Sequence, residues 1–169
     1  ILLYCMCFDE IWKTWKLHPY FESDGESNSI SYMYTCPLSC GELLEIKPNL
    51  YEHLIDSISA AKRSDIEKSF QKLRQWHADM GWSGDKWPWQ SYVGLRLPFL
   101  ISLHEALGNE TLVGIAQTYF IDPGAFRKGW PDITAIDSKK NVKLFEIKTS
   151  DKFHPSQIIT LTAMDPFIR

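Results

Sequence analysis

Apolar side chains recur every three or four residues between Pro48 and Gly81, as they do on one face of an amphipathic α-helix. The stripe breaks once, so this stretch predicts two helices or one bent helix. Ser64 followed by Glu67 is typical of a capping box, which would open the second segment, and Gly81 would end it. The apolar positions of the two stripes are Leu54, Ile58, Ala61, Ile66, Phe70, Leu73 and Met80.

A further helical pattern covers Phe99 to Leu107, an apolar stretch followed by Gly108, and glycine is common directly after a helix. Pro98 would either open this helix or bend it. Farther along the chain, residues 150–162 predict a loop followed by a helix, with Pro155 in its first turn.

Three segments have the period and the β-branched content of strands. They are Leu112 to Ile121, Ile133 to Ile136, and Val142 to Lys148. Turn residues at 123–124 and 138–141 separate them. The resulting order of helix, three strands and helix predicts an α/β or α+β layered fold.

The chain has 169 residues, of which 44% are hydrophobic, enough for one domain or for one domain with an extension. Its formal net charge is −3, so any contact with a polyanion has to come from a local basic patch. No apolar run approaches the roughly 20 residues of a membrane-spanning helix. We therefore expect a soluble protein with no membrane partner.

Four cysteines stand in two close pairs, Cys5 with Cys7 and Cys36 with Cys40. A tetrathiolate zinc site usually has about two to four residues between neighbouring ligands, and the first pair is too tight for this spacing. We therefore favour free thiols in a reducing, intracellular compartment, either cytoplasm or nucleus, over structural zinc or disulfides.

The candidate chemistry lies on the last predicted strand. Because side chains two apart share a face of a strand, Glu146 and Lys148 point together. Phe145 and Ile147 point to the opposite face, which we expect to be core. An acid beside a base on an otherwise apolar strand costs free energy unless the two are paired, exposed or bound to a charged ligand.

Asp132 stands 14 positions before Glu146, and a hairpin turn at residues 138–141 would carry it back beside the second strand. Two carboxylates would then converge, which favours a hard divalent cation with oxygen ligands from both side chains and from a strand carbonyl such as that of Ile147. Mg²⁺ or Mn²⁺ is the natural occupant, and it would stabilise charge on a phosphate and lower the pKa of a bound water. Lys148 could orient that water or neutralise the transition state.

The same segment resembles the VRR-NUC branch of the PD-(D/E)XK nuclease superfamily. That family has glycine, any residue and Pro-Asp before a strand with acid-x-Lys, followed by a polar loop and a helix that bears glutamine. It usually has Gly-Pro directly after the lysine, where this chain has Thr149-Ser150. The matching residues are Gly129-Trp130-Pro131-Asp132-Ile133, then Phe145-Glu146-Ile147-Lys148, then Asp151-Lys152 and Gln157.

The resemblance implies a divalent-metal-dependent nuclease that hydrolyses phosphodiester bonds. Its catalytic residues would be Asp132, Glu146, Lys148 and Gln157, of which the two acids would be metal ligands. Gln157 would contact the active-site strand or the DNA backbone. The family also has an acidic residue on an earlier helix. Because Gly84-Asp85 resembles that segment of the longer, Fanconi-type members, Asp85 is the candidate third carboxylate, with Glu105 as the alternative.

The resemblance also implies a restriction-endonuclease-like core, a small mixed sheet flanked by helices, over residues 83–169. A mainly helical extension would precede it over residues 1–82. The substrate would be branched or flapped DNA, read by shape, with Arg127, Lys128 and Lys152 on the phosphate backbone. An RNA endonuclease of the same superfamily, a module that binds nucleic acid or a protein without turnover, and a homodimer stay open.

Overall fold

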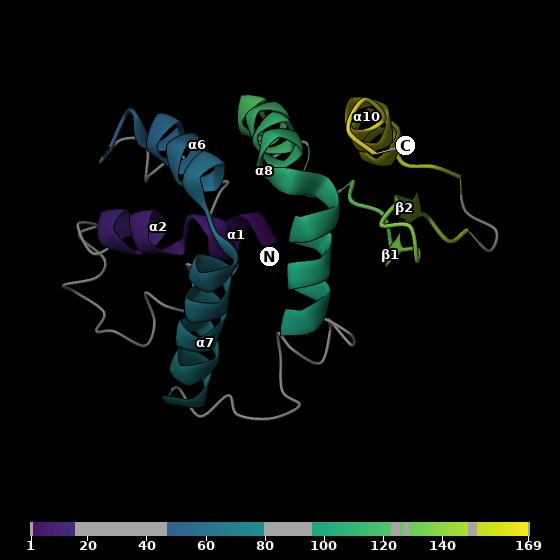
Figure 1. The fold of residues 1–169 in the computed structure, drawn as a ribbon. Helices are drawn as coiled ribbons and strands as arrows, with labels where there is room; N and C mark the ends of the chain where they lie inside the picture. The colour runs from purple at the N-terminus through teal and green to yellow at the C-terminus, as the bar shows by residue number, and fades with distance from the viewer. Residues whose placement is uncertain are drawn as a thin grey trace. The chain divides into compact units, whose positions relative to one another are not determined.

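The computed structural model describes residues 2–15, 47–79, 96–122, 126, 129–148 and 152–168 (Figure 1). Two strands, β1 (Ile133–Ile136) and β2 (Val142–Phe145), pair into an antiparallel sheet. Helices predominate beside this small sheet, which agrees with the α+β expectation. The helices in the described ranges are α1 (Leu2–Met6), α2 (Phe8–Trp15), α6 (Leu50–Ala60), α7 (Arg63–Asp79), α8 (Leu97–Ile121) and α10 (Pro155–Met164).

The chain divides into two compact units, residues 1–101 and 102–169. The predicted boundary between residues 82 and 83 falls outside the described residues, so that division of the chain stays a prediction. Helices are the regular structure of the first unit wherever it is described, and the second unit holds the hairpin and α10. Among the described parts of the chain, none of the helices is both long enough and apolar enough to cross a membrane.

One buried stripe on each helix explains why α6 and α7 form. Both stripes follow helical spacing, and of the two alternatives, two helices or one bent helix, the structure has two helices. α1 contacts α6 and α7, and Lys72 Nζ of α7 lies 2.7 Å from Asp9 Oδ1 of α2. The buried positions are Leu50, Leu54 and Ile58 on α6 and Ile66, Phe70 and Leu73 on α7.

The start of α7 differs from the prediction. The helix begins at Arg63, and the backbone N–H of Lys62 donates to Asp65 Oδ2 over 2.9 Å. Ser64 is exposed inside the first turn, and Glu67 pairs with Arg63 Nε at 2.8 Å. The predicted Ser64–Glu67 capping box is therefore wrong. Asp65 fills the third helical position, from which a carboxylate reaches back to the N–H that precedes the helix.

The described cysteines are buried, free thiols. Burial raises the pKa of Cys5 to about 11, and burial raises the pKa of Cys7 well above its usual range. Cys7 Sγ also donates to the carbonyl of Leu3 at 3.0 Å. Cys5 and Cys7 thus form no disulfide, while Cys36 and Cys40 lie outside the described residues and the choice between free thiols and zinc stays a prediction.

α8 covers both a predicted helix and a predicted strand. Gly108 interrupts it with φ 72° and ψ 162°, a conformation that is essentially confined to glycine, so the first helix does end there. Pro98 is the second residue of α8 and opens it. The strand predicted over Leu112–Ile121 is wrong, because a second helical stretch follows the glycine. Its buried residues recur at helical spacing: Leu112, Ile115, Ala116 and Phe120.

The β1–β2 hairpin is defined by its register and its turn. Ile133 lies opposite Phe145 at the open end. At the turn, Asp137 Oδ1 accepts from the backbone N–H groups of Lys139 at 2.8 Å and Asn141 at 2.9 Å. The Asn141 side chain and these N–H groups hold the pKa of Asp137 below its usual range. The turn predicted at residues 138–141 is therefore confirmed, with Asp137 as its anchor.

Replacing Gly108 with alanine tests the break in α8. Within the described residues, an added Cβ would meet no atom from outside its own stretch of helix within 4 Å, so we attribute the effect to the backbone conformation. We expect the free energy of unfolding to fall by about 1–3 kcal/mol, whereas in an unbroken helix the same change would raise it by about 1 kcal/mol. Urea unfolding, followed by circular dichroism, shows whether the free energy of unfolding falls or rises. A rise would contradict the break in α8 at Gly108. Ser102→Ala, at an exposed position of α8, is the control, with a change within about 0.5 kcal/mol.

Candidate functional site

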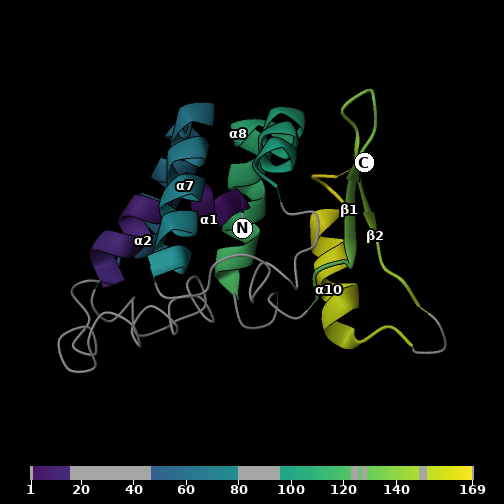
Figure 2. The same ribbon diagram turned by 90° about the horizontal axis from the view of Figure 1, so that it is seen from below.

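The hairpin face that carries the acid and the base is covered, and the opposite face is open. β2 ends at Phe145, earlier than predicted, so Glu146, Ile147 and Lys148 follow the strand. The side chain of Glu146 is only 6% exposed, whereas Phe145 and Ile147 are 48% and 58% exposed. The expectation that Phe145 and Ile147 face the core is therefore wrong. α10 lies beside the hairpin (Figure 2), and its Gln157 reaches Glu146, so this helix covers the acidic side.

Three side chains join α10 to the end of the hairpin. Lys148 Nζ lies 3.0 Å from Glu146 Oε1 and donates to Gln157 Oε1 at 2.9 Å. Gln157 Nε2 donates to Glu146 Oε1, and Gln157 Oε1 accepts from the backbone N–H of His154 at 2.9 Å. Gln157 is the third residue of α10, so it satisfies an N–H at the helix start while it binds both charged side chains. The amide thus positions the acid and the base.

The second carboxylate oxygen of Glu146 is buried and has no hydrogen-bond partner among the described residues. A buried carboxylate costs free energy when its lone pairs are unmatched, and Lys148 and Gln157 both bind the other oxygen. Glu146 Oε2 therefore keeps a capacity to accept a hydrogen bond or to bind a cation that none of the described residues meets.

Asp132 lies on the adjoining segment, directly before β1. Its Oδ2 accepts from the backbone N–H of Ile147 at 2.9 Å, one residue after Glu146. Extending the register of Ile133 opposite Phe145 by one residue puts Asp132 opposite Glu146, on the same side of the hairpin. The structure thus brings the two acids to one end of the hairpin, with Asp132 exposed and Glu146 buried.

Gly129 allows the segment that leads to Asp132 to approach α10 closely. A Cβ at this position would collide with the backbone carbonyl of Ser156 and the hydroxyl of Thr160, both on α10. Only glycine, which has no Cβ, leaves room for this contact. α10 contacts both halves of the site, the Gly129 segment and the end of the hairpin.

No third acid joins the pair within the described residues. Glu105 Oε2 lies 3.3 Å from Lys140 Nζ, and Lys140 belongs to the turn, at the far end of the hairpin from Glu146. Asp85, the other candidate, lies outside the described residues. Across the residues that the structure describes, no three His, Cys, Asp or Glu side chains are grouped so as to hold a metal ion.

The predicted contacts to phosphate are only partly described. Arg127 and Lys128 lie outside the described residues, and Lys152 is exposed in the stretch before α10. The neighbouring Phe153 was not predicted as a site residue. Lys148 Nζ lies 5.5 Å from the centre of its ring, and the residue is 48% exposed. Its sequence signal is weak, a single aromatic residue between polar neighbours.

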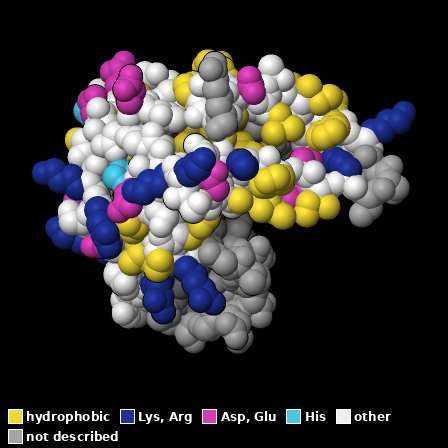
Figure 3. Space-filling view, turned by 45° about the vertical axis from the view of Figure 1, so that its right-hand side comes forward, with side chains coloured by type: hydrophobic (Ala, Val, Ile, Leu, Met, Phe, Trp, Pro, Cys, Tyr) yellow, Lys and Arg dark blue, Asp and Glu magenta, His cyan; other side chains and the backbone are white. Residues whose placement is uncertain are grey.

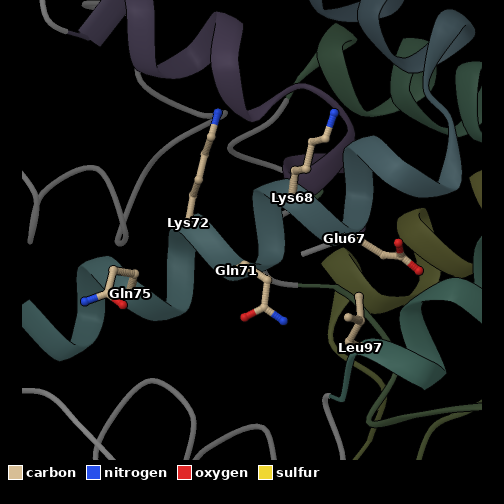
Figure 4. A pocket seen from close by; sticks show the side chains of 6 residues that line it. All are labelled: Glu67, Lys68, Gln71, Lys72, Gln75 and Leu97. Atoms are coloured by element: carbon tan, nitrogen blue, oxygen red, sulfur yellow. The ribbon is translucent and has the colours of Figure 1, made fainter.

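A groove lies on the first unit. On the face drawn in Figure 3, basic and acidic side chains are interspersed. The groove itself has a volume of about 700 Å³ and runs along α7 (Figure 4). Lys72, one of its lysines, is already paired with Asp9. At least one of the groove's charges is therefore already matched by a neighbouring acid. It is lined by Glu67, Lys68, Gln71, Lys72, Gln75 and Leu97.

Comparison with known proteins gives no match: no protein-family model, no curated protein sequence and no solved structure corresponds to the chain. The resemblance to the VRR-NUC branch rests on the residues quoted above and stays an expectation. The functional interpretation therefore depends on the chemistry of the site.

Substituting Gly129 with alanine tests the close approach to α10. Because the new Cβ would meet a backbone carbonyl that cannot move without shifting the helix, we expect the free energy of unfolding to fall by about 1–3 kcal/mol. Ser138→Ala, at an exposed turn position, is the control and should change it by less than about 0.5 kcal/mol. Thermal unfolding measures both variants, and a Gly129→Ala chain as stable as the parent contradicts the contact.

Proposed function

We propose that this chain is a divalent-metal-dependent nuclease that hydrolyses phosphodiester bonds at the end of the hairpin. The observation that supports it most is the buried oxygen of Glu146 that has no partner among the described residues. The exposed carboxylate of Asp132 lies on the adjoining segment, bound to the N–H of the residue after Glu146. Lys148 and Gln157 complete the proposed catalytic set.

The donor set suits a hard divalent cation. Mg²⁺ and Mn²⁺ prefer carboxylate, carbonyl and water oxygens, and both acidic residues lie at this end of the hairpin. We assign Asp132, Glu146 and the carbonyl of Ile147 as protein ligands, with Asp85 as the candidate for a further one. The chemistry that such a cation supplies is polarisation of the phosphate and activation of a water.

Lys148 is the side chain of the protein itself that would act on the substrate, in addition to the cation. Its ammonium is held between Glu146 and Gln157, so it is oriented before any substrate binds. A fixed positive charge beside the phosphate oxygens stabilises the negative charge that grows during hydrolysis, and it does so more strongly in a partly buried site than in water. Gln157 is a positioning residue in this scheme, because it acts through Lys148 and Glu146.

We propose branched or flapped DNA as the substrate. The basis is the resemblance of the Pro-Asp and acid-x-Lys segments to VRR-NUC nucleases, which act on such DNA. Arg127, Lys128 and Lys152 are the proposed contacts to the phosphate backbone, and such contacts orient DNA without reading its sequence. A local cluster of this kind fits a chain whose net charge is −3.

A second candidate is a nuclease-like module that binds nucleic acid or a protein without cleaving it. The observation that favours it is the lack, within the described ranges, of a third carboxylate grouped with Asp132 and Glu146. An RNA endonuclease with the same residues is a further alternative that differs in substrate alone.

Asp132→Asn tests catalysis. Asparagine keeps an oxygen that can accept from the N–H of Ile147, but it removes the negative charge. We therefore expect the fold to persist and Mn²⁺-dependent cleavage of a flapped or branched duplex to fall by at least about 100-fold. Cleavage is measured on denaturing gels, with single-stranded RNA of the same sequence assayed in parallel.

Asp165→Asn is the matched control for this assay, because Asp165 is an exposed acid at the opposite end of α10. It should cleave as the parent does. Equal cleavage by Asp132→Asn and the parent would refute the assignment of Asp132, and cleavage of RNA alone would identify the RNA branch.

Titration calorimetry with Mn²⁺ separates the enzyme from the module. The proposal predicts that the parent binds Mn²⁺ and that Glu146→Gln binds it at least about tenfold more weakly, because the variant loses a charged ligand. Binding of Mn²⁺ without cleavage of any of these substrates supports the module. Identical affinity in the two chains counts against a cation at Glu146.

A further inference from the structure

We propose that Phe153 is a stacking platform for an unpaired base beside the site, so that the chain selects DNA whose strand is single at the position of cleavage. The inference rests on the proposed nuclease function and narrows its substrate. Phe153 lies directly before α10 and is 48% exposed.

Phe153 contacts the lysine of the proposed site. Lys148 Nζ lies 5.5 Å from the centre of the Phe153 ring, in a cation–π arrangement. The same Nζ binds Glu146 and Gln157. The ring is therefore held at the edge of the proposed site, with nearly half of the residue open to solvent.

A nucleobase suits the exposed part of this ring. Stacking needs only the π face that every base has, so it selects an unpaired base without selecting its identity. Bases inside a duplex are already stacked and paired, and for this reason a base has to be single-stranded to lie on a side chain. One sugar joins a base to its own phosphate. A base on Phe153 therefore keeps that phosphate close to Lys148.

Among the described residues of the second unit, the other exposed apolar side chains do not combine these features. Trp130 is 38% exposed, but no contact of its ring with Lys148 is found there. Phe145 is equally exposed, at 48%, but alternation along the chain turns it to the hairpin face away from Glu146. Ile158 and Ile159 are exposed on α10, yet their aliphatic side chains have no π face to stack on a base. Phe153 combines an exposed ring with a contact to the catalytic lysine.

The test measures DNA binding without cleavage, by fluorescence anisotropy in buffer with EDTA. The probes are a duplex with a single-stranded 5′ flap and a fully paired duplex of equal length. Phe153→Leu should bind the flapped probe about tenfold more weakly than the parent, and Phe153→Trp about as tightly as the parent. Neither change should affect the paired probe. Phe145→Leu is the matched control, the same substitution at an equally exposed phenylalanine, and both affinities should stay unchanged.

Equal flap affinity of Phe153→Leu and the parent overturns the inference. Three other results overturn it as well. Phe153→Leu could lose as much affinity for the paired probe as for the flapped probe, Phe145→Leu could lose the same affinity for the flapped probe, or the parent could fail to bind the flapped probe. Failure of the nuclease proposal is seen separately. A parent that does not cleave with Mn²⁺, but whose flap binding depends on Phe153, keeps the stacking site and loses the nuclease. If the parent cleaves flapped DNA but Phe153→Leu binds the flapped probe as tightly as the parent does, the nuclease proposal stands and the stacking site is refuted.

Discussion

Burial of the Glu146 carboxylate against α10 is the constraint on which the rest of the site depends. A carboxylate removed from water has to be matched by opposite charge and by hydrogen-bond donors. Lys148 provides the charge from two residues along the same segment, and Gln157 provides an amide donor from the helix. Gln157 also accepts from the N–H of His154, so the start of α10 and the end of the hairpin are joined through one side chain. The acid, the base and the helix are therefore positioned together.

A second contact extends this constraint to Asp132. The chain runs against α10 at Gly129, where a side chain would collide with the helix, and Asp132 follows three residues later. The carboxylate then returns to the hairpin by accepting from the N–H of Ile147. α10 therefore contacts the chain both at Glu146 and three residues before Asp132, while the hairpin itself places Asp132 beside Ile147.

The sequence predicts the hairpin well, because turn residues and the Asp132–Glu146 spacing depend on local geometry. It predicts other features poorly where packing decides. The β-branched content of Leu112–Ile121 favoured a strand, although the apolar positions that become buried there follow helical spacing. Likewise, the apolar Phe145 and Ile147 were expected to face the core, since alternation along a strand identifies two faces but not which of them a helix will cover. The contact of Phe153 with Lys148 joins the start of α10 to the end of the hairpin, and no local pattern encodes such a tertiary contact.

The ion pair between Lys148 and Glu146 also bears on how the chain behaves when nothing is bound. In many small metal-dependent domains the ligands repel one another until the ion arrives, so that folding and ion uptake are a single event. Here an internal ammonium already balances the buried carboxylate. The helix–hairpin contact therefore does not depend on a bound ion to offset the charge of Glu146.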